Sequence, residues 1–391
     1  MPRRKQLGLL IGTQFAYGRN VWRGAGQYVQ HLGRAWSFRG IRYDTPPSEA
    51  VRHLAAWNVQ GVIAHVSDSD LIQALDRLGV PVVSTSDSVA DLPFPIVGAD
   101  DAAAGTMAAE YFLSQGFRHF AYLGASNLPY ACHRGEGFRE RLRRQGFVCL
   151  TYEPRHKVIP GYLDHTAWIE PDRKCQDWLA SLPRPTALLA CNDDSATQAC
   201  DLAAEAGLRV PEDIAIMGVD DDELLCEFAT PPISSVRIPA VRIGYEAARL
   251  LESLMAGRKA PPKAIHLLPT GITVRHSTDL LAVQDPELAE ALRFIRSHAR
   301  EPINVEDVVE EVAICRTLLE RRFRAALGRT PLEEIHRVKI EQAKQLLAES
   351  NLSIPTVATS SGFRDGKHLH AVFVRYVGCP PIRYRAQFQA R

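Results

Sequence analysis

The chain of 391 residues lacks the features that mark membrane proteins and disulfide-bonded proteins. No apolar run reaches the ~18 residues that a membrane span needs. The eight cysteines are scattered without a CxxC pair, which argues against zinc and against a disulfide framework and fits a reducing cytoplasm. The apolar stretch at residues 7–12 is too short for a signal peptide and no small-residue cleavage site follows it, so we interpret it as a first buried strand.

Motifs of catalysis and of cofactor binding are also missing. The chain has no GxSxG, HExxH or Walker A sequence, and Gly24-Ala-Gly26 lacks the third glycine of a dinucleotide loop. The acidic run Asp220–Glu223 suggests a cation site, but four consecutive acids on one strand-helix turn cannot all face one ion. We therefore expect no metal, no cofactor and no enzymatic activity.

Charge is distributed unevenly, although the formal net charge is only +1. Residues 286–391 hold 17 Lys and Arg against 13 Asp and Glu, whereas residues 1–285 hold 29 against 32. A basic C-terminal segment on an acidic body is typical of contact with nucleic acid, although many solvated helical domains carry a similar charge.

Short apolar runs alternate with amphipathic stretches from residue 7 to about 270, which predicts α/β structure with parallel sheets between helices. There are too many runs for one compact sheet, so we predict two doubly wound lobes. The predicted strands are Leu7–Ile11, Gly61–Ala64, Pro81–Ser84, Ile96–Gly98, Phe120–Leu123, Ala187–Ala190, Ile214–Val219 and Ser234–Val236, and the helices between them include 101–115, 133–145, 194–206 and 241–256.

After Leu280 the pattern is helical only. We predict a two-lobed domain over residues 1–275, a linker over 276–285 and an all-α domain over 286–391. The N-cap signals are Asp285, Asn304, Ser353 and the capping box Thr330–Glu333. The predicted helices are 286–299, 305–312, 315–327, 331–348, 354–360 and 366–376.

The all-α domain repeats itself. Four residues recur at a spacing of fifty, as the pairs Leu319 and Leu369, Phe323 and Phe373, Gly328 and Gly378, and Pro331 and Pro381. We interpret the repeat as two helix-turn-helix motifs joined by a long helix. Such an arrangement holds two recognition helices so that they enter successive major grooves, about 34 Å apart.

Residues Val308 to Arg385 closely resemble the AraC family DNA-binding domain, through Leu319–Phe323, Gly328–Pro331, Gly362-Phe363 and Gly378–Pro381. The sequence departs from the family at two positions: Cys315 stands where the family usually has a capping serine, and Ala371 stands where many members have an arginine. Because the second motif lacks that arginine, whereas the first has Arg316 and Arg321, we expect the first motif to carry most of the base readout. Both motifs offer candidate DNA-binding residues, for which the alternative is that they are ordinary solvated surface residues. The candidate DNA-binding residues are Arg316, Thr317, Glu320 and Arg321 in the first recognition helix and Gly366, Lys367, His370 and Ala371 in the second.

The two-lobed domain resembles the periplasmic-binding-protein type I fold used by the sensor domains of LacI-type regulators, through Arg134–Phe138, Ala190–Ala196 and Met217–Asp221. The resemblance implies that one arginine and two acids hold sugar hydroxyls, and a carboxylate or guanidinium can engage two hydroxyls at once. The alternative for the two acids is that they are plain helix N-caps. The candidate sugar-binding residues are Arg134, Asp193 and Asp220, with Tyr17 and Asn20 from the loop after the first strand.

A LacI-type sensor domain followed by an AraC-type DNA-binding domain resembles the bacterial regulators of xylose operons along nearly the whole chain. The resemblance implies a cytoplasmic, D-xylose-responsive activator that binds double-stranded DNA at tandem promoter-proximal sites as a homodimer and recruits RNA polymerase. The alternatives are another sugar effector, or repression in place of activation. A sugar-processing enzyme with a DNA-binding appendage is the distant alternative.

Overall fold

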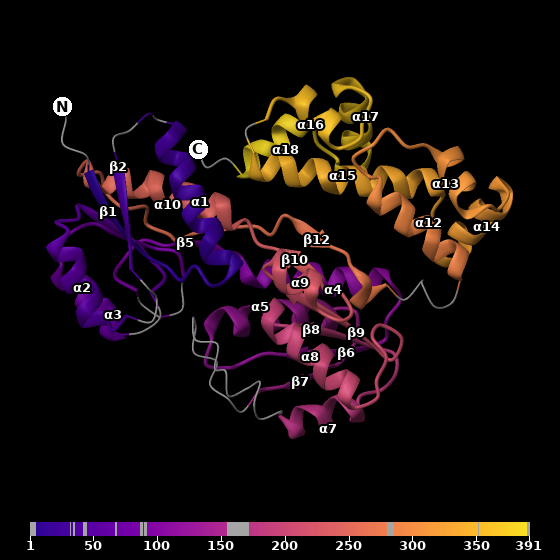
Figure 1. The fold of residues 1–391 in the computed structure, drawn as a ribbon, viewed down its shortest axis with the longest axis horizontal. Coiled ribbons are helices and arrows are strands. Elements are labelled where there is room, and N and C mark those ends of the chain that lie inside the picture. The colour runs from indigo at the N-terminus through magenta and orange to yellow at the C-terminus, as the bar shows by residue number, and fades with distance from the viewer. Residues whose placement is uncertain are drawn as a thin grey trace. The chain divides into compact units, whose positions relative to one another are not determined.

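The computed structural model describes residues 5–31, 33, 36–41, 45–66, 69–86, 89, 92–154, 172–279, 285–350 and 352–388. It divides the chain into two compact units, Met1–Thr278 and Asp279–Arg391 (Figure 1). This division falls inside the predicted linker 276–285, of which residues 280–284 lie outside the described residues. No helix in the described part of the chain is both long and apolar enough to cross a bilayer.

The first lobe of unit one is a parallel sheet of order β2-β1-β3-β4. Its core is aliphatic and includes Leu54, Val62 and Leu75, all fully buried. The strands are β1 (Lys5–Leu10), β2 (Trp36–Gly40), β3 (Gly61–Ala64) and β4 (Val82–Ser84), and the helices are α1 (Ala16–His31), α2 (Pro47–Ala56), α3 (Ser69–Arg77) and α10 (Ala240–Met255).

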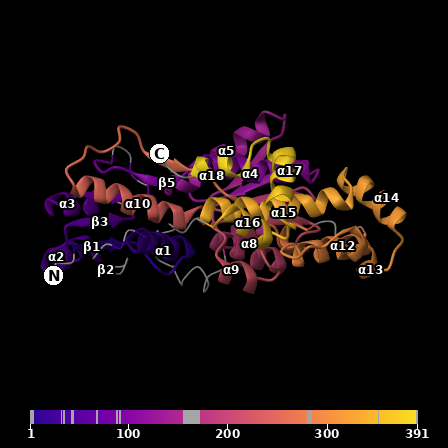
Figure 2. The same cartoon turned by 90° about the horizontal axis from the view of Figure 1, so that it is seen from above.

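Helices α1 and α10 lie against each other in both views (Figures 1 and 2). A side chain at Gly24 would collide with the carbonyl of Val241, and one at Gly244 would collide with the carbonyl of Val21. Gly24 therefore serves the close approach of two helices, which agrees with the rejection of a dinucleotide loop there.

The second lobe is a six-stranded sheet of order β12-β10-β9-β8-β6-β7, parallel except for the β10–β12 pair. Its strands are β6 (His119–Leu123), β7 (Cys149–Tyr152), β8 (Thr186–Ala190), β9 (Ile214–Val219), β10 (Ser234–Arg237) and β12 (Gly271–Thr273). Its helices are α4 (Asp101–Ser114), α5 (Pro129–Arg143), α7 (Arg173–Ser181), α8 (Asp193–Glu205) and α9 (Glu223–Phe228). A separate pair, β5 (Val97–Ala99) with β11 (Ile265–Leu267), is also parallel, and the short helix η1 (His276–Thr278) ends the unit.

Within unit two, the long helix α15 (Figure 2) contributes side chains to two small hydrophobic cores. Ile335 packs with the first core, around Phe323, whereas Ala343 and Leu347 pack with the second, around Phe373. The helices are α12 (Pro286–Ser297), α13 (Val305–Val312), α14 (Arg316–Leu327), α15 (Pro331–Glu349), α16 (Ile354–Ser360), α17 (Gly366–Val377) and α18 (Pro381–Phe388).

The fifty-residue repeat is a repeat of structure. Helices α14 and α17 both end at a glycine of positive φ, Gly328 at 66° and Gly378 at 78°, and a proline then begins the next helix. Glycine is favoured at this position because it adopts the left-handed conformation without a steric cost. Two interpretations needed correction: α14 begins at Arg316 with Cys315 as its N-cap, and α18 was not predicted although Pro381 repeats Pro331.

Candidate functional site

Four of the predicted sugar-binding residues, and two residues that were not predicted, lie on separate helices and strand ends of unit one. Asp101 and Asp193 are the first residues of α4 and α8, and Asp220 directly follows β9. Tyr17 lies in the first turn of α1, and Arg134 lies in α5. In open α/β sheets this edge, at the carboxyl ends of the strands, is where ligands bind. We call Tyr17, Asp101, Tyr130, Arg134, Asp193 and Asp220 the strand-end cluster.

Arg134 is the centre of the cluster, and its side chain is buried. Its Nε donates to Asp101 Oδ1 at 2.7 Å, its Nη1 to the Cys191 carbonyl at 2.6 Å and its Nη2 to Asp220 Oδ1 at 3.0 Å. The guanidinium also lies over the Tyr130 ring, 4.8 Å from its centre. Burial alone would lower the pKa of Arg134, but Asp220 and Asp101 hold that pKa above its ordinary value.

Asp220 is the partly exposed acid of the cluster, with 23% of its side chain accessible. Its φ of 110° lies in the region that favours glycine, so its contacts must hold the backbone there. Burial raises the pKa of its carboxyl, while Arg134 opposes the shift. Among the described residues no hydrogen bond reaches Asp220 Oδ2, which leaves that oxygen available to a ligand hydroxyl.

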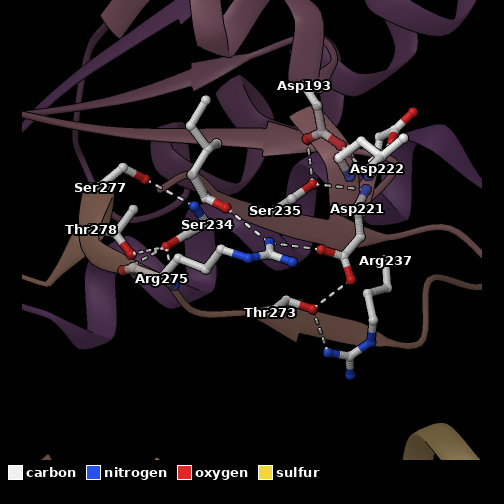
Figure 3. Close-up of polar contacts among 12 residues, drawn as sticks. Asp193, Asp221, Asp222, Ser234, Ser235, Arg237, Thr273, Arg275, Ser277 and Thr278 are labelled. Atoms are coloured by element: carbon white, nitrogen blue, oxygen red, sulfur yellow. Dashed lines mark hydrogen bonds and ion pairs between the residues drawn. The ribbon is translucent and has the colours of Figure 1, made fainter. Parts of the chain in front are cut away.

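Each oxygen of the Asp193 carboxyl accepts one hydrogen bond from the protein. The hydroxyl of Ser235 donates to Oδ1 at 2.5 Å, and the Asp222 amide donates to Oδ2 at 2.7 Å (Figure 3). Burial, and then the charge of Asp220, raise the pKa of Asp193 well above its ordinary value. A side chain at Gly218 would collide with Asp193, so the carboxylate has a defined place.

The N-cap alternative for the two predicted acids is wrong. Asn192 caps α8 by accepting from the Ser195 amide at 2.8 Å, and Asp222 caps α9 by accepting from the Leu224 amide. Asp193 and Asp220 therefore make other contacts.

The acidic run Asp220–Glu223 does not converge on one point. Asp220 pairs with Arg134, Asp221 pairs with Arg275, and Glu223 is exposed. No group of acids, histidines or cysteines among the described residues has the arrangement of a metal site.

Asp222 joins the two lobes. Its carboxylate accepts from the Ala16 amide at 2.9 Å and from Arg19 Nη2 at 3.0 Å. Asp222 is buried and belongs to the second lobe, whereas Ala16 and Arg19 begin α1 in the first. This contact, and the roles of Asp101 and Tyr130, were not predicted. The sequence signal for Asp101 is its place as the first helical residue after a short apolar strand.

Tyr17 and Asn20 occupy α1 as half-buried residues. The Tyr17 hydroxyl donates to the Thr85 carbonyl at 2.6 Å, and its ring meets His65 edge-on. Burial, together with the charges of Asp101 and Asp220, raises the pKa of Tyr17, so the phenol stays neutral. Tyr17 therefore lies within the electrostatic field of the acids of the strand-end cluster. The described residues give Asn20 no hydrogen bond or ion pair, and its assignment stays a prediction.

The first candidate recognition helix is α14, where Arg316, Thr317 and Arg321 are exposed and Glu320 is half-buried. Arg316 is engaged on both sides: its Nε donates to Glu320 Oε1 at 3.1 Å, and its Nη1 contacts Glu306. Arg321 has no ion pair among the described residues. Cys315 precedes the helix as its N-cap and makes no side-chain capping hydrogen bond.

The second candidate recognition helix is α17, where Lys367, His370 and Ala371 are exposed and Gly366 is half-buried. Asp365 caps this helix by accepting from the His368 amide at 2.8 Å. The two helices differ in the side chains that they expose: the first exposes Arg316 and Arg321, whereas the second exposes Lys367, His370 and Ala371. That the first carries most of the base readout stays a prediction.

Matches to known families agree with this division. Residues 109–278 match a periplasmic binding protein-like domain, and residues 308–387 match a helix-turn-helix domain. The fold and the matches define the class: this chain is a DNA-binding transcription regulator with an α/β sensor-type unit followed by an AraC-type double helix-turn-helix unit, and it is not an enzyme.

Relatives of known name align with nearly the full length of the chain. The xylose operon regulatory protein of Escherichia coli K12 is 28% identical over 98% of this chain and 97% of its own. That of Haemophilus influenzae is 27% identical over 97% and 98%. A solved structure of the xylose-binding transcription activator xylR is 28% identical, covers 98% of both chains and has a TM-score of 0.60. The resemblances predicted from the residues are confirmed.

Proposed function

We propose that the strand-end cluster binds a sugar and that sugar binding sets the affinity of the helix-turn-helix unit for DNA. The observation that carries the proposal is the position of Arg134, buried and paired with two acids where the strands of an α/β sheet end. A sugar presents paired hydroxyls, and Asp220 Oδ2 and the Tyr17 oxygen can accept from them. Asp193 orients the loop after β9 and keeps a second lone pair on each oxygen for a ligand.

D-xylose is the proposed effector. Relatives aligned over the whole length are named for the xylose operon, and one solved relative is described as xylose-binding. A further sugar with the same pattern of hydroxyls is the alternative, because the cluster recognises hydroxyl pairs and its geometry does not select one pentose.

Activation of promoters in the cytoplasm is the proposed mode of action, with RNA polymerase as the recruited partner. We also propose a homodimer, since two copies place four recognition helices on tandem sites. Exposed apolar side chains on α9 support a self-association face: Phe228 is 83% exposed and Leu224 is 62% exposed.

Calorimetry with D-xylose tests the sugar assignment, and Asp220→Asn is the sharpest variant. Asparagine tolerates the positive φ and keeps the shape of the side chain, while Arg134 retains Asp101 as its partner. We expect wild type to bind xylose and the variant to lose most of the affinity. The matched control is Asp213→Asn, which removes an acid of the same lobe that pairs with the exposed Arg209.

Absence of binding at millimolar xylose would overturn xylose as the effector and leave the regulator intact. Unchanged binding by Asp220→Asn would instead overturn the placement of the site. A reporter in a deletion strain separates the modes of regulation, because loss of expression marks an activator and gain marks a repressor.

A further inference from the structure

The loop after β9 makes contacts in two directions from adjacent residues. Asp220 pairs with Arg134 in the strand-end cluster, and Asp221 pairs with Arg275, whose Nη1 lies 2.8 Å from Asp221 Oδ1. The φ angles of Asp220 and Asp221 are 110° and 53°. Two non-glycine residues in succession hold such a conformation only when surrounding contacts fix it. The two carboxylates therefore stand on one short stretch of constrained backbone.

Arg275 is also held at the start of β10 (Figure 3). The same Nη1 donates to the Ile233 carbonyl at 2.9 Å, and the Arg275 amide donates to Ser234 Oγ at 2.7 Å. Asp221 Oδ2 in turn accepts from the hydroxyl of Thr273 at 2.6 Å. Asp221 thus holds two residues of the segment 273–278, on opposite sides of its carboxylate.

The remainder of that segment is anchored by buried hydroxyls. Ser234 Oγ and Thr278 Oγ1 lie 2.7 Å apart, and the hydroxyl of Ser277 donates to the Ile216 carbonyl at 2.5 Å. All three hydroxyl-bearing side chains are at most 2% exposed. Buried, hydrogen-bonded networks of this kind favour discrete arrangements over gradual deformation.

The segment ends where unit two begins. Thr278 is the last residue of the first unit, and Asp279 is the first residue of the second. Within unit two, Nη1 of Arg296 on α12 donates to Asp279 Oδ2 at 2.7 Å. The residue that follows the anchored segment is therefore itself bound to the first helix of the DNA-binding unit.

We infer that the Asp221–Arg275 ion pair couples ligand occupancy at Asp220 to the segment 273–278 and through it to the DNA-binding unit. The inference rests on the proposed function, because it concerns how sugar in the strand-end cluster is reported. In this inference Asp221 and Arg275 are positioning residues that act through Asp220, the proposed ligand contact next to Asp221. A ligand shifts the segment only to the extent that it favours one arrangement of the loop.

The test uses the full-length chain with D-xylose as the probe and Asp221→Asn as the variant. Asparagine keeps the size of the side chain and tolerates positive φ, but it loses the charge that binds Arg275. The matched control is Glu223→Gln. Glu223 lies two residues after Asp221, and its side chain is exposed, so the substitution removes a charge without breaking the ion pair. Three quantities are measured for each protein: xylose affinity, amide hydrogen exchange over residues 271–279, and the change in DNA affinity that xylose produces.

We expect Asp221→Asn to bind xylose as the control does, which also shows that it folds. In the variant, the protection that xylose gives to residues 271–279 and the xylose-dependent change in DNA affinity should fall at least about fivefold, the lower end of common coupling factors. Arg275→Gln removes the other partner of the ion pair. The double variant Asp221→Asn/Arg275→Gln should lose no more coupling than either single variant.

Xylose binding with unchanged protection and an unchanged DNA response in Asp221→Asn would overturn the inference and leave the proposed function standing. A loss of thermal stability with intact coupling would do the same, because it would mark the pair as purely structural. Absence of xylose binding or of a DNA response in wild type would overturn the proposed function, and the inference with it.

Discussion

Glu334 on α15 offers a prediction whose magnitude follows from the structure. Its side chain is fully buried and contacts Arg337 of the same helix, with Oε1 to Nη2 at 2.6 Å, and Arg329 of the preceding loop, with Oε2 to Nε at 2.5 Å. Burial alone would raise the pKa of Glu334, but the two arginines lower it to about 2 from an ordinary 4.5. The acid therefore joins the end of the first helix-turn-helix motif to the connecting helix.

The shift corresponds to about 3 kcal/mol of folding stability at neutral pH, since one pKa unit is about 1.4 kcal/mol. Because the folded-state pKa is depressed, this stability is fully present above pH 4.5 and is lost as the pH falls through 2. Less than half of it remains at pH 3 by the same linkage relation.

Glu334→Gln should therefore lower the local free energy of unfolding around α14 and α15 by about 3 kcal/mol at pH 7, and by clearly less at pH 3. Hydrogen exchange of the amides in these helices measures it in the full-length chain. Glu341→Gln is the control on the same helix: Glu341 pairs with Lys344 three residues on but is 31% exposed, so we expect less than about 1 kcal/mol. Equal effects of the two substitutions, or a Glu334→Gln effect that does not depend on pH, would refute the reasoning.

Three further predictions concern a cap, a helix contact and base readout. Cys315→Ser supplies the missing cap of α14 and should raise stability by about 0.5–2 kcal/mol in thermal unfolding; no gain would mean that the serine hydroxyl does not accept a hydrogen bond from the amides of the first turn. Gly24→Ala should destabilise the first unit in denaturant unfolding because it collides with α10, whereas Gly26→Ala, which meets open space, should be neutral or stabilising; similar effects would contradict the close helix contact. Arg321→Ala should weaken specific DNA binding by about 1–3 kcal/mol and relax one base position in a binding-site selection; a uniform loss over all sequences would mark a phosphate contact instead.

Sequence patterns predicted the elements that are buried or capped. The strand Ile214–Val219 was predicted with its observed bounds, and Asn304 and Thr330 cap the helices assigned to them. The strands that were missed are short or lie at sheet edges: β2 and β7 are partly exposed, and β11 and β12 have three residues each. Such segments carry little apolar periodicity, and their pairing is decided by the sheet beside them.

The candidate site was only partly accessible from the sequence. The resemblance indicated Arg134 and Asp220, and the structure brings the two together. The sequence carries no local signal that joins Asp222 to Arg19 or Asp221 to Arg275, because these residues are 203 and 54 positions apart. Contacts of this kind depend on the order of the strands in the sheet, and a residue's neighbours along the chain do not specify that order.

The most direct test of the central claim is a titration of operator DNA, obtained by binding-site selection, with the full-length chain. The titration is carried out with and without millimolar D-xylose and is monitored by fluorescence anisotropy of the DNA. Our account predicts that xylose changes the DNA affinity of wild type, and that Asp220→Asn keeps the sugar-free affinity but loses the response. The same DNA affinity with and without sugar, or a response in Asp220→Asn equal to that of wild type, would contradict it.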